Sequence, residues 1–164
     1  MRQFSFVQKG FTLLELVVVI GIITLISGIV TVNLIKFQRT ASISAAITVL
    51  TADMKRQQLK AMSGATEGGT TSDNYSIYFQ SDRYTLFHGS TYNASDLSNY
   101  IVILEKNISF STINLPDNTI VYSQLSGEVL GFSPTQNYFI IRNTVGDEQK
   151  IISFNRHGVV TGIE

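Results

Sequence analysis

The chain of 164 residues is long enough for one domain and a membrane anchor, and its 12 Lys and Arg balance its 12 Asp and Glu. A neutral chain is not built to coat nucleic acid by charge alone, although local basic patches stay open. The sequence contains no Cys, which excludes a disulfide framework, a thiolate nucleophile and a Cys-ligated zinc site.

The first element is a long apolar run. No charged residue occurs from Leu16 to Ile35, and at about 1.5 Å per residue this stretch spans roughly 30 Å, the thickness of a hydrocarbon core. The run is longer than the apolar region of a signal peptide, about 7–15 residues, and no small-residue cleavage site follows it. We therefore predict a transmembrane half-helix over residues 11–35. An uncleaved anchor without further function is the simpler alternative.

Glu15 stands beside this apolar run, where a carboxylate is costly. An ionised side chain in a bilayer costs about 2.5–3.5 kcal/mol and is rarely left without a partner. Lys9 is six residues away, which is a poor helical spacing, whereas Phe11 is four residues upstream on the same helical face. Phe11 gains a positive charge if the chain is cut between Gly10 and Phe11, because the cut creates a free amine there.

The stretch "KGFTLLEL", Lys9 to Leu16, resembles the prepilin cleavage motif of type IV pilins and type II secretion pseudopilins. In that motif a basic leader ends in Gly, and Phe-Thr-Leu-x-Glu opens a long apolar helix. The resemblance implies that a prepilin peptidase removes a cytoplasmic leader, residues 1–10, by cutting after Gly10, and that Phe11 is then N-methylated. It also implies that Glu15 meets the Phe11 amine of a neighbouring subunit during assembly.

The resemblance further implies a location and a set of partners. The chain is expected in the cytoplasmic (inner) membrane as a single-pass protein, and then in a periplasmic or cell-surface filament. Its expected partners are other pilin or pseudopilin subunits, the prepilin peptidase and an inner-membrane assembly platform. A buried carboxylate and a buried amine each cost several kcal/mol alone, so we expect their pairing to set subunit register more than stability.

Small residues recur along the same apolar helix. They stand at intervals of three, four and three residues, which places them on one face: Gly21, Thr24, Gly28 and Thr31. Small side chains let membrane helices approach closely. We therefore predict that this face packs against neighbouring helices, although Gly and Thr are also common in membrane helices without such a role.

The helix is expected to continue beyond the membrane. Residues 36–63 contain no Pro and are rich in good helix formers, and an apolar stripe recurs there at spacings of four, three and four: Ile43, Ile47, Leu50 and Met54. Gly64 is the expected C-cap. The sequence thus predicts one helix from about Thr12 to Ser63, amphipathic in its second half.

Short strands follow a flexible linker over residues 64–74. We predict them over residues 75–79, 84–88, 100–105, 107–113, 120–125, 137–142, 149–154 and 159–163. The last three are expected to form antiparallel hairpins. The predicted fold class is α+β: a long N-terminal helix packed on an antiparallel β-sheet domain formed by residues 64–164. This is the lollipop arrangement that the pilin resemblance implies.

Two stretches are similar to minor pseudopilins of the GspH/FimT type. They are the helix end "LTADMKRQQLKAMSG" and the closing "QKIISFNRHGVVTG". Major type IVa pilins close their C-terminal region with a disulfide, which a chain without Cys cannot form. Major pseudopilins often carry a calcium site, but we find no convincing ligand cluster, since Asp147 and Glu148 fit a solvated turn better. We predict no metal and no cofactor.

An enzyme is not predicted. His88 and His157 are the two histidines, and they lack any metal-binding spacing. No nucleophile elbow and no P-loop is present. We therefore expect a structural subunit, a minor component of a type IV pilus or a type II secretion pseudopilus.

The alternative is a filament-borne module that binds DNA or another surface, for example in DNA uptake. Four C-terminal residues can form a basic face on adjoining strands and turns: Arg142, Lys150, Arg156 and His157. The simpler interpretation is that they form the polar side of a hairpin, interleaved with Asp147 and Glu148.

Overall fold

The computed structural model describes residues 10–66 and 72–164, without the side chains of residues 29–33, 35 and 36. The chain divides into two compact units, Met1–Gln38 and Arg39–Glu164. The predicted leader, apart from Gly10, and the middle of the predicted linker lie outside the described residues.

Helix α1 spans Leu13–Met62, 50 residues, within one residue of both predicted ends. Its C-terminus has the hydrogen bonds of a Schellman motif. Gly64 has a positive φ of 65°, its N–H donates to Ala61 O at 3.2 Å, and the N–H of Ala65 donates to Lys60 O at 3.1 Å. The predicted C-cap at Gly64 is thus confirmed, and it ends the helix because a left-handed residue cannot continue the helical ladder.

The described residues form eight strands in two four-stranded antiparallel sheets, all in the unit Arg39–Glu164. The first sheet has the order β3-β2-β1-β5 and consists of β1 (Tyr75–Phe79), β2 (Arg83–His88), β3 (Tyr100–Ile103) and β5 (Thr119–Tyr122). The second has the order β4-β6-β7-β8 and consists of β4 (Ile108–Asn114), β6 (Tyr138–Asn143), β7 (Gln149–Phe154) and β8 (Val160–Ile163). A short 3-10 helix, η1 (Pro116–Asn118), joins β4 to β5.

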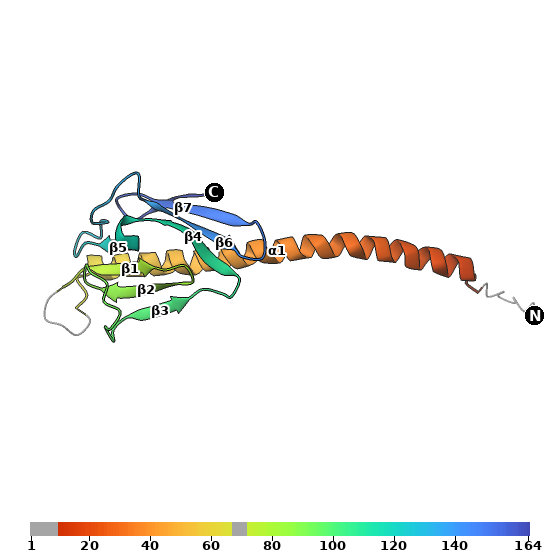
Figure 1. Cartoon of the computed structure of the whole chain (residues 1–164), viewed down its shortest axis with the longest axis horizontal. Coiled ribbons are helices and arrows are strands. Elements are labelled where there is room, and N and C mark those ends of the chain that lie inside the picture. The colour runs from red at the N-terminus through yellow and green to blue at the C-terminus, as the bar shows by residue number, and fades with distance from the viewer. Residues whose placement is uncertain (1–9, 67–71) are drawn as a thin grey trace, which may run out of the picture. The chain divides into compact units, whose positions relative to one another are not determined.

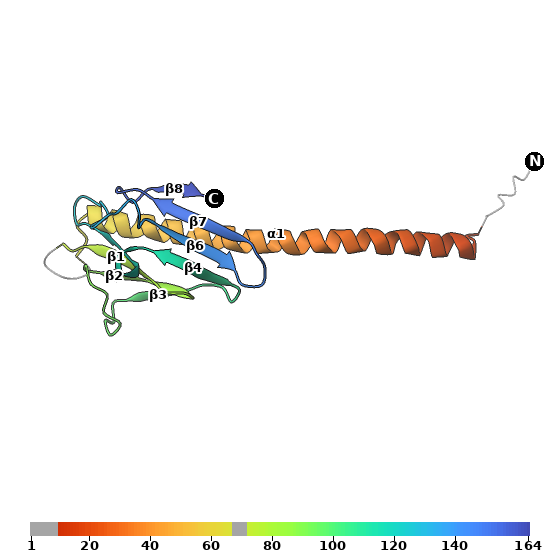
Figure 2. The same ribbon diagram turned by 45° about the horizontal axis from the view of Figure 1, so that its top comes forward.

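The α+β class is confirmed, but the predicted strands divide between two sheets instead of forming one. A turn after β3, closed by the N–H of Ile108 donating to Glu105 O at 2.8 Å, leads the chain out of the first sheet. Strand β4 then pairs with β6, from Ile108 opposite Asn143 to Asn114 opposite Tyr138. Figures 1 and 2 show both sheets lying alongside the C-terminal part of α1.

The core lies between this part of α1 and the two sheets. The predicted stripe is its helical side, and each member is at most 7 % exposed: Ile43, Ile47, Leu50 and Met54. Three rings join the sheets: Phe79 of β1 lies 5.4 Å from Phe110 of β4 and 5.1 Å from Phe139 of β6, measured between ring centroids. Such ring pairs contribute about 0.5–1.5 kcal/mol beyond the area they bury.

Candidate functional site

The first turn of α1 contains the residues of the predicted cleavage and assembly site. Thr12 caps the helix, because its Oγ1 accepts the N–H of Glu15 at 3.2 Å and its carbonyl accepts the N–H of Leu16 at 3.1 Å. Glu15 therefore occupies the third helical position, where the helix dipole favours a carboxylate. Phe11 and Gly10 immediately precede the cap.

This cap was not among the elements predicted from the sequence. Its signal was present as Thr12-x-x-Glu15, the spacing of a capping box. The cap engages the backbone N–H of Glu15, and the carboxylate of Glu15 lies in the first helical turn, where the helix dipole favours a negative charge.

The apolar side chains that follow the cap are exposed. Every large apolar side chain from Phe11 to Ile26 is at least 43 % exposed, and the exposed fraction reaches 83 % at Phe11. A continuous apolar surface of this extent is typical of an interface with protein or lipid, because exposure to water is unfavourable. Residues 11–26 therefore form an exposed apolar helix surface.

The predicted small-residue face is open where it is described. A Cβ added at Gly21 or Gly28 would meet no atom within 4 Å. The hydroxyl of Thr24 donates to Ile20 O at 2.8 Å, which satisfies it within the helix. The side chain of Thr31 lies outside the described residues. Helix packing through this face stays a prediction.

Within the part of the chain that is described, no helix reaches the length and hydropathy expected of a membrane span. The transmembrane role of residues 11–35 stays a prediction.

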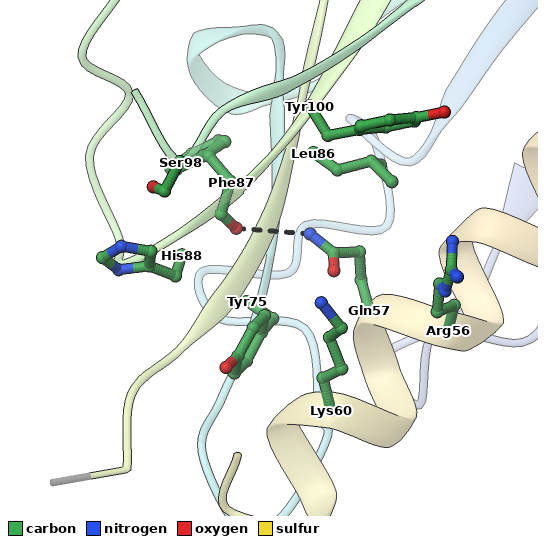
Figure 3. Close-up of a pocket in the computed structure, with 9 residues that line it drawn as sticks. All are labelled: Arg56, Gln57, Lys60, Tyr75, Leu86, Phe87, His88, Ser98 and Tyr100. Carbon is green, nitrogen blue, oxygen red and sulfur yellow. Dashed lines mark hydrogen bonds between the residues drawn. The ribbon is translucent and has the colours of Figure 1, made fainter. Parts of the chain in front are cut away.

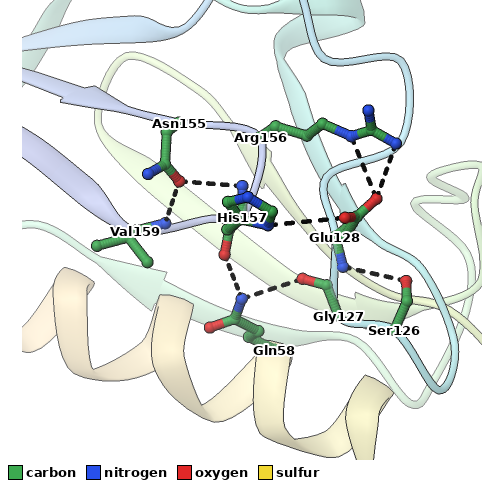
Figure 4. A network of polar contacts seen from close by, with 8 residues as sticks. All are labelled: Gln58, Ser126, Gly127, Glu128, Asn155, Arg156, His157 and Val159. Atoms are coloured by element: carbon green, nitrogen blue, oxygen red, sulfur yellow. Dashed lines mark hydrogen bonds and ion pairs between the residues drawn. The ribbon is translucent and has the colours of Figure 1, made fainter.

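Two residues of the predicted basic face lie together beside an acidic partner (Figure 4). Arg156 Nη2 is 3.0 Å from Glu128 Oε2, and His157 Nδ1 is 3.6 Å from Glu128 Oε1. The turn that presents them is held from below by Gln58, whose Nε2 donates to His157 O at 2.5 Å and to Gly127 O at 3.0 Å. Glu128 thus offsets much of the positive charge of this turn.

The other two basic residues point to opposite faces of the second sheet. Arg142 is paired across the ladder with Gln149, and Lys150 with Ile141, which is fully buried on the core side. Since neighbouring residues of a strand alternate in direction, Lys150 lies on the side of Ile141 and Arg142 on the outer side. The structure therefore does not place Arg142 and Lys150 on one face of the second sheet.

No group of three or more His, Asp or Glu side chains with metal-binding geometry occurs among the described residues. His88 Nδ1 lies 3.6 Å from Asp73 Oδ2, and both residues are half-buried, His88 at the end of β2.

Comparison with known proteins points to the N-terminal residues. Residues 6–31 match the family model of the prokaryotic N-terminal methylation motif. The match contains Gly10, Phe11 and Glu15, and it supports a type IV pilin-like, prepilin-type N-terminus. No curated protein and no solved structure matches the chain.

Proposed function

We propose that the chain is a prepilin that is cut between Gly10 and Phe11, N-methylated at Phe11 and assembled through its N-terminal helix into a filament. In this proposal residues 11–35 hold the precursor in the cytoplasmic membrane. The β-sheet domain faces the other side and supplies the filament surface. The chain works as a structural subunit and performs no catalysis.

The main support is the match of the methylation motif over residues 6–31. Two features of the structure agree with it. The helix begins at a cap directly after the proposed cleavage site, and the apolar side chains from Phe11 to Ile26 form an exposed surface. A helix of this kind needs an apolar surrounding, which lipid supplies before assembly and neighbouring helices supply in a filament.

Glu15 has the central role in this proposal. The amine created at Phe11 is positive, and the carboxylate of Glu15 on a neighbouring subunit is its complement. Each charge is costly in an apolar environment unless it is paired. Subunits that stack at the wrong height leave both charges unpaired, so the pair selects one register.

Within the pilin-like class we propose a minor component of the GspH/FimT type. The support is the similarity of the helix end and of the closing hairpin, together with the lack of the Cys pair that closes major type IVa pilins. Binding of DNA through Arg142, Lys150, Arg156 and His157 is not part of the proposal, because Arg142 and Lys150 lie on opposite faces of the second sheet and Glu128 lies beside Arg156 and His157.

The experiment that tests the proposal is mass spectrometry of the protein recovered from sheared filaments. We expect a first residue of Phe11 that carries one methyl group. Protein that begins at Met1, or that is missing from filaments while present in the membrane, would contradict the proposal.

The role of Glu15 is tested by Glu15→Gln. Gln retains the size of the side chain and is also favourable in a capping box, so cleavage and membrane insertion should continue. Incorporation into filaments should fall at least about tenfold, the effect of losing roughly 1.4 kcal/mol. Glu105→Gln, in an exposed turn, is the matched control and should assemble normally. Equal incorporation of both variants would exclude the pairing role.

A further inference from the structure

The sequence contains three Asn-x-Ser triplets, the acceptor motif of N-linked glycosylation: Asn74-Tyr75-Ser76, Asn93-Ala94-Ser95 and Asn107-Ile108-Ser109. Their middle residues are not Pro, so the sequence alone does not distinguish them. All three lie in the unit Arg39–Glu164. The structure does distinguish them, because an acceptor must offer the amide of its Asn and the hydroxyl of its Ser to an enzyme.

The first triplet is closed by hydrogen bonds. Asn74 Nδ2 donates to Ser90 Oγ at 2.7 Å, and Asn74 Oδ1 accepts the N–H of Gln124 at 2.8 Å. Ser76 is a fully buried residue of β1, and its hydroxyl donates to Gly89 O at 2.5 Å. Neither the amide nor the hydroxyl can reach an enzyme unless the start of β1 unfolds.

The third triplet is part of a sheet. Asn107 is exposed, but Ile108 is 3 % exposed and begins β4. The N–H of Ile108 donates to Glu105 O at 2.8 Å, and Asn107 O accepts the N–H of Thr144 at 2.8 Å. Ser109 follows within the ladder between β4 and β6. An enzyme would have to pull the start of β4 out of the second sheet to use this triplet.

The second triplet lies open on the loop between β2 and β3. Asn93, Ala94 and Ser95 are all exposed. Asn93 forms an Asx turn, in which its Oδ1 accepts the N–H of Ser95 at 3.0 Å. This turn uses only the oxygen of the amide. Within the part of the chain that is described, Asn93 Nδ2 and Ser95 Oγ have no hydrogen-bond partner, so both groups are available to an enzyme.

The loop is fixed at the residue before this triplet. The ring of Tyr92 stacks on Tyr78 of β1, with 4.2 Å between the ring centroids. It also meets the ring of Phe87 of β2 edge-on, at 5.5 Å between centroids. Phe87 is tied to α1, because Gln57 Nε2 donates to Phe87 O at 3.2 Å (Figure 3). The loop thus presents the triplet in a defined and exposed conformation without a binding partner.

Asn93 also lies beside the open edge of the first sheet. Its carbonyl accepts from Asn99 Nδ2 at 2.7 Å, and Asn99 directly precedes β3. Strand β3 pairs with β2, and among the described residues no strand pairs with its other side. Ile101 and Ile103 of this strand are exposed. Open edges tend to pair with strands of other chains unless something covers them.

We propose that Asn93 is an N-glycosylation site and that its glycan covers the open edge of β3. The donor is an oligosaccharide linked to a polyprenyl diphosphate, and a membrane-bound transferase catalyses the step. Asn93 Nδ2 bonds to C1 of the first sugar, the bond from C1 to the diphosphate oxygen breaks, and polyprenyl diphosphate leaves with the electron pair. One proton of Nδ2 passes to a carboxylate of the transferase.

The glycan is large enough for this role. Strand β3 has four residues and spans about 13 Å, so a glycan of a few sugars attached beside its first residue reaches along the whole edge. The proposal rests on the proposed function in one respect. It requires the β-sheet domain to lie on the outer side of the membrane, where the donor presents its oligosaccharide.

Tandem mass spectrometry of the full chain, isolated from the membranes and filaments of the cells that make it, tests the site. We expect a glycan on Asn93 and none on Asn74 or Asn107. An unmodified Asn93 in a chain that begins at Phe11 would overturn the glycosylation site and leave the proposed function intact. A chain that begins at Met1 would contradict the proposed function, and the presence or absence of the glycan on its Asn93 would still decide the site.

Matched variants at Ser95 test recognition of the triplet. Ser95→Ala should abolish the modification, whereas Ser95→Thr should retain it, because Thr also supplies the hydroxyl that the motif requires. Asn107→Gln changes another exposed Asn of the same motif and should leave the glycan in place. A glycan on Asn93 of Ser95→Ala, or its loss in Asn107→Gln, would refute recognition of this triplet.

Light scattering on heating tests whether the glycan covers the edge. Ser95→Ala and Ser95→Thr both keep the backbone N–H of the Asx turn, so they differ mainly in the glycan. In a non-ionic detergent, the full-length Ser95→Ala chain should aggregate at a lower temperature than Ser95→Thr. Adding Ile103→Lys to both should remove this difference, because the charge protects the same edge. Equal aggregation of Ser95→Ala and Ser95→Thr would refute the covering role.

Discussion

Two tyrosines of the core differ in how their hydroxyls are satisfied. Tyr84 Oη donates to Asp53 Oδ2 at 2.6 Å, which ties β2 to α1. Tyr122 Oη is buried and has no hydrogen-bond partner in the described part of the chain. We therefore expect Tyr84→Phe to lower the free energy of unfolding by about 1 kcal/mol, and Tyr122→Phe to leave it unchanged or raise it. Urea unfolding of the full chain in detergent measures both, and a larger loss for Tyr122→Phe would contradict the assignment.

The same two hydroxyls predict how stability depends on alkaline pH. Burial raises the pKa of Tyr122, and burial together with the hydrogen bond to Asp53 raises the pKa of Tyr84. In the unfolded chain a tyrosine loses its proton at about pH 10, whereas in the folded chain these two tyrosines keep it to a higher pH. The contribution of the two protonated hydroxyls to the free energy of unfolding is therefore complete below about pH 10 and is lost as the pH rises further. Melting temperatures should fall above about pH 10, less steeply for Tyr122→Phe. Parallel curves for the variant and the unmodified chain would show that Tyr122 does not contribute.

Position 158 requires a glycine because of its backbone conformation and because its neighbours leave no space for a side chain. Its φ is 69°, and an added Cβ would lie 2.6 Å from Tyr122 Cε1 in the core. Gly131 has a similar φ of 64°, but an added Cβ there would meet nothing within 4 Å. We expect Gly131→Ala to cost about 1 kcal/mol from backbone strain alone, and Gly158→Ala about 2–4 kcal/mol because of the added clash. Equal losses of unfolding free energy would mean that the Tyr122 ring moves aside freely.

At the level of elements, β3 is an unprotected sheet edge. It contains no charged residue, Ile103 is 69 % exposed and Ile101 is 51 % exposed. The edge strand β4 carries a bulge between Phe110 and Thr112, a feature that discourages pairing with other chains. We expect Ile103→Lys to reduce self-association without loss of stability, since the side chain already faces solvent. Light scattering of the full chain on heating measures this effect, with Thr112→Lys on β4 as control. Unchanged scattering by Ile103→Lys would show that β3 does not drive association.

The elements themselves could be predicted to different degrees. Local signals sufficed for α1, because Gly64 marks its end and the apolar spacing from Ile43 to Met54 marks its buried face. The division of the strands into two sheets could not be predicted. It depends on β4 pairing with β6 across an intervening strand, and such pairing leaves no local trace in the sequence.

The residues of the candidate site also differ in how far the sequence alone predicts their arrangement. Gly10, Phe11 and Glu15 lie within one short motif, which is readable because its residues are neighbours in the chain. The geometry of the basic residues was not readable in this way, since the side to which Lys150 points depends on its register opposite Ile141. A cleft lined by Arg56, Lys60, Leu86 and Tyr100 was not predicted either, because its residues come from segments that are distant in the sequence.

For the folded unit as a whole, two consecutive amides on α1 attach the helix to both sheets. Gln57 donates to carbonyls of β1 and β2, at Ser76 and Phe87. Gln58 donates to Gly127 O and to His157 O, in the segments that lead to the second sheet and its last hairpin. Apolar packing alone permits a helix to slide or rotate on a sheet, whereas these hydrogen bonds fix one position for it.

Replacing either amide by Leu should therefore lower the stability of the whole unit. Each change leaves two carbonyls without their donor, and we expect a loss of about 2–4 kcal/mol in the free energy of unfolding. Urea unfolding followed by circular dichroism measures these losses.

Hydrogen exchange shows which part of the unit each variant loosens. In Gln58→Leu, the protection of backbone amides from exchange should fall first at Gly127 and His157, whereas in Gln57→Leu it should fall first in β1 and β2. Identical exchange patterns in the two variants would show that the helix does not hold the two sheets through separate contacts.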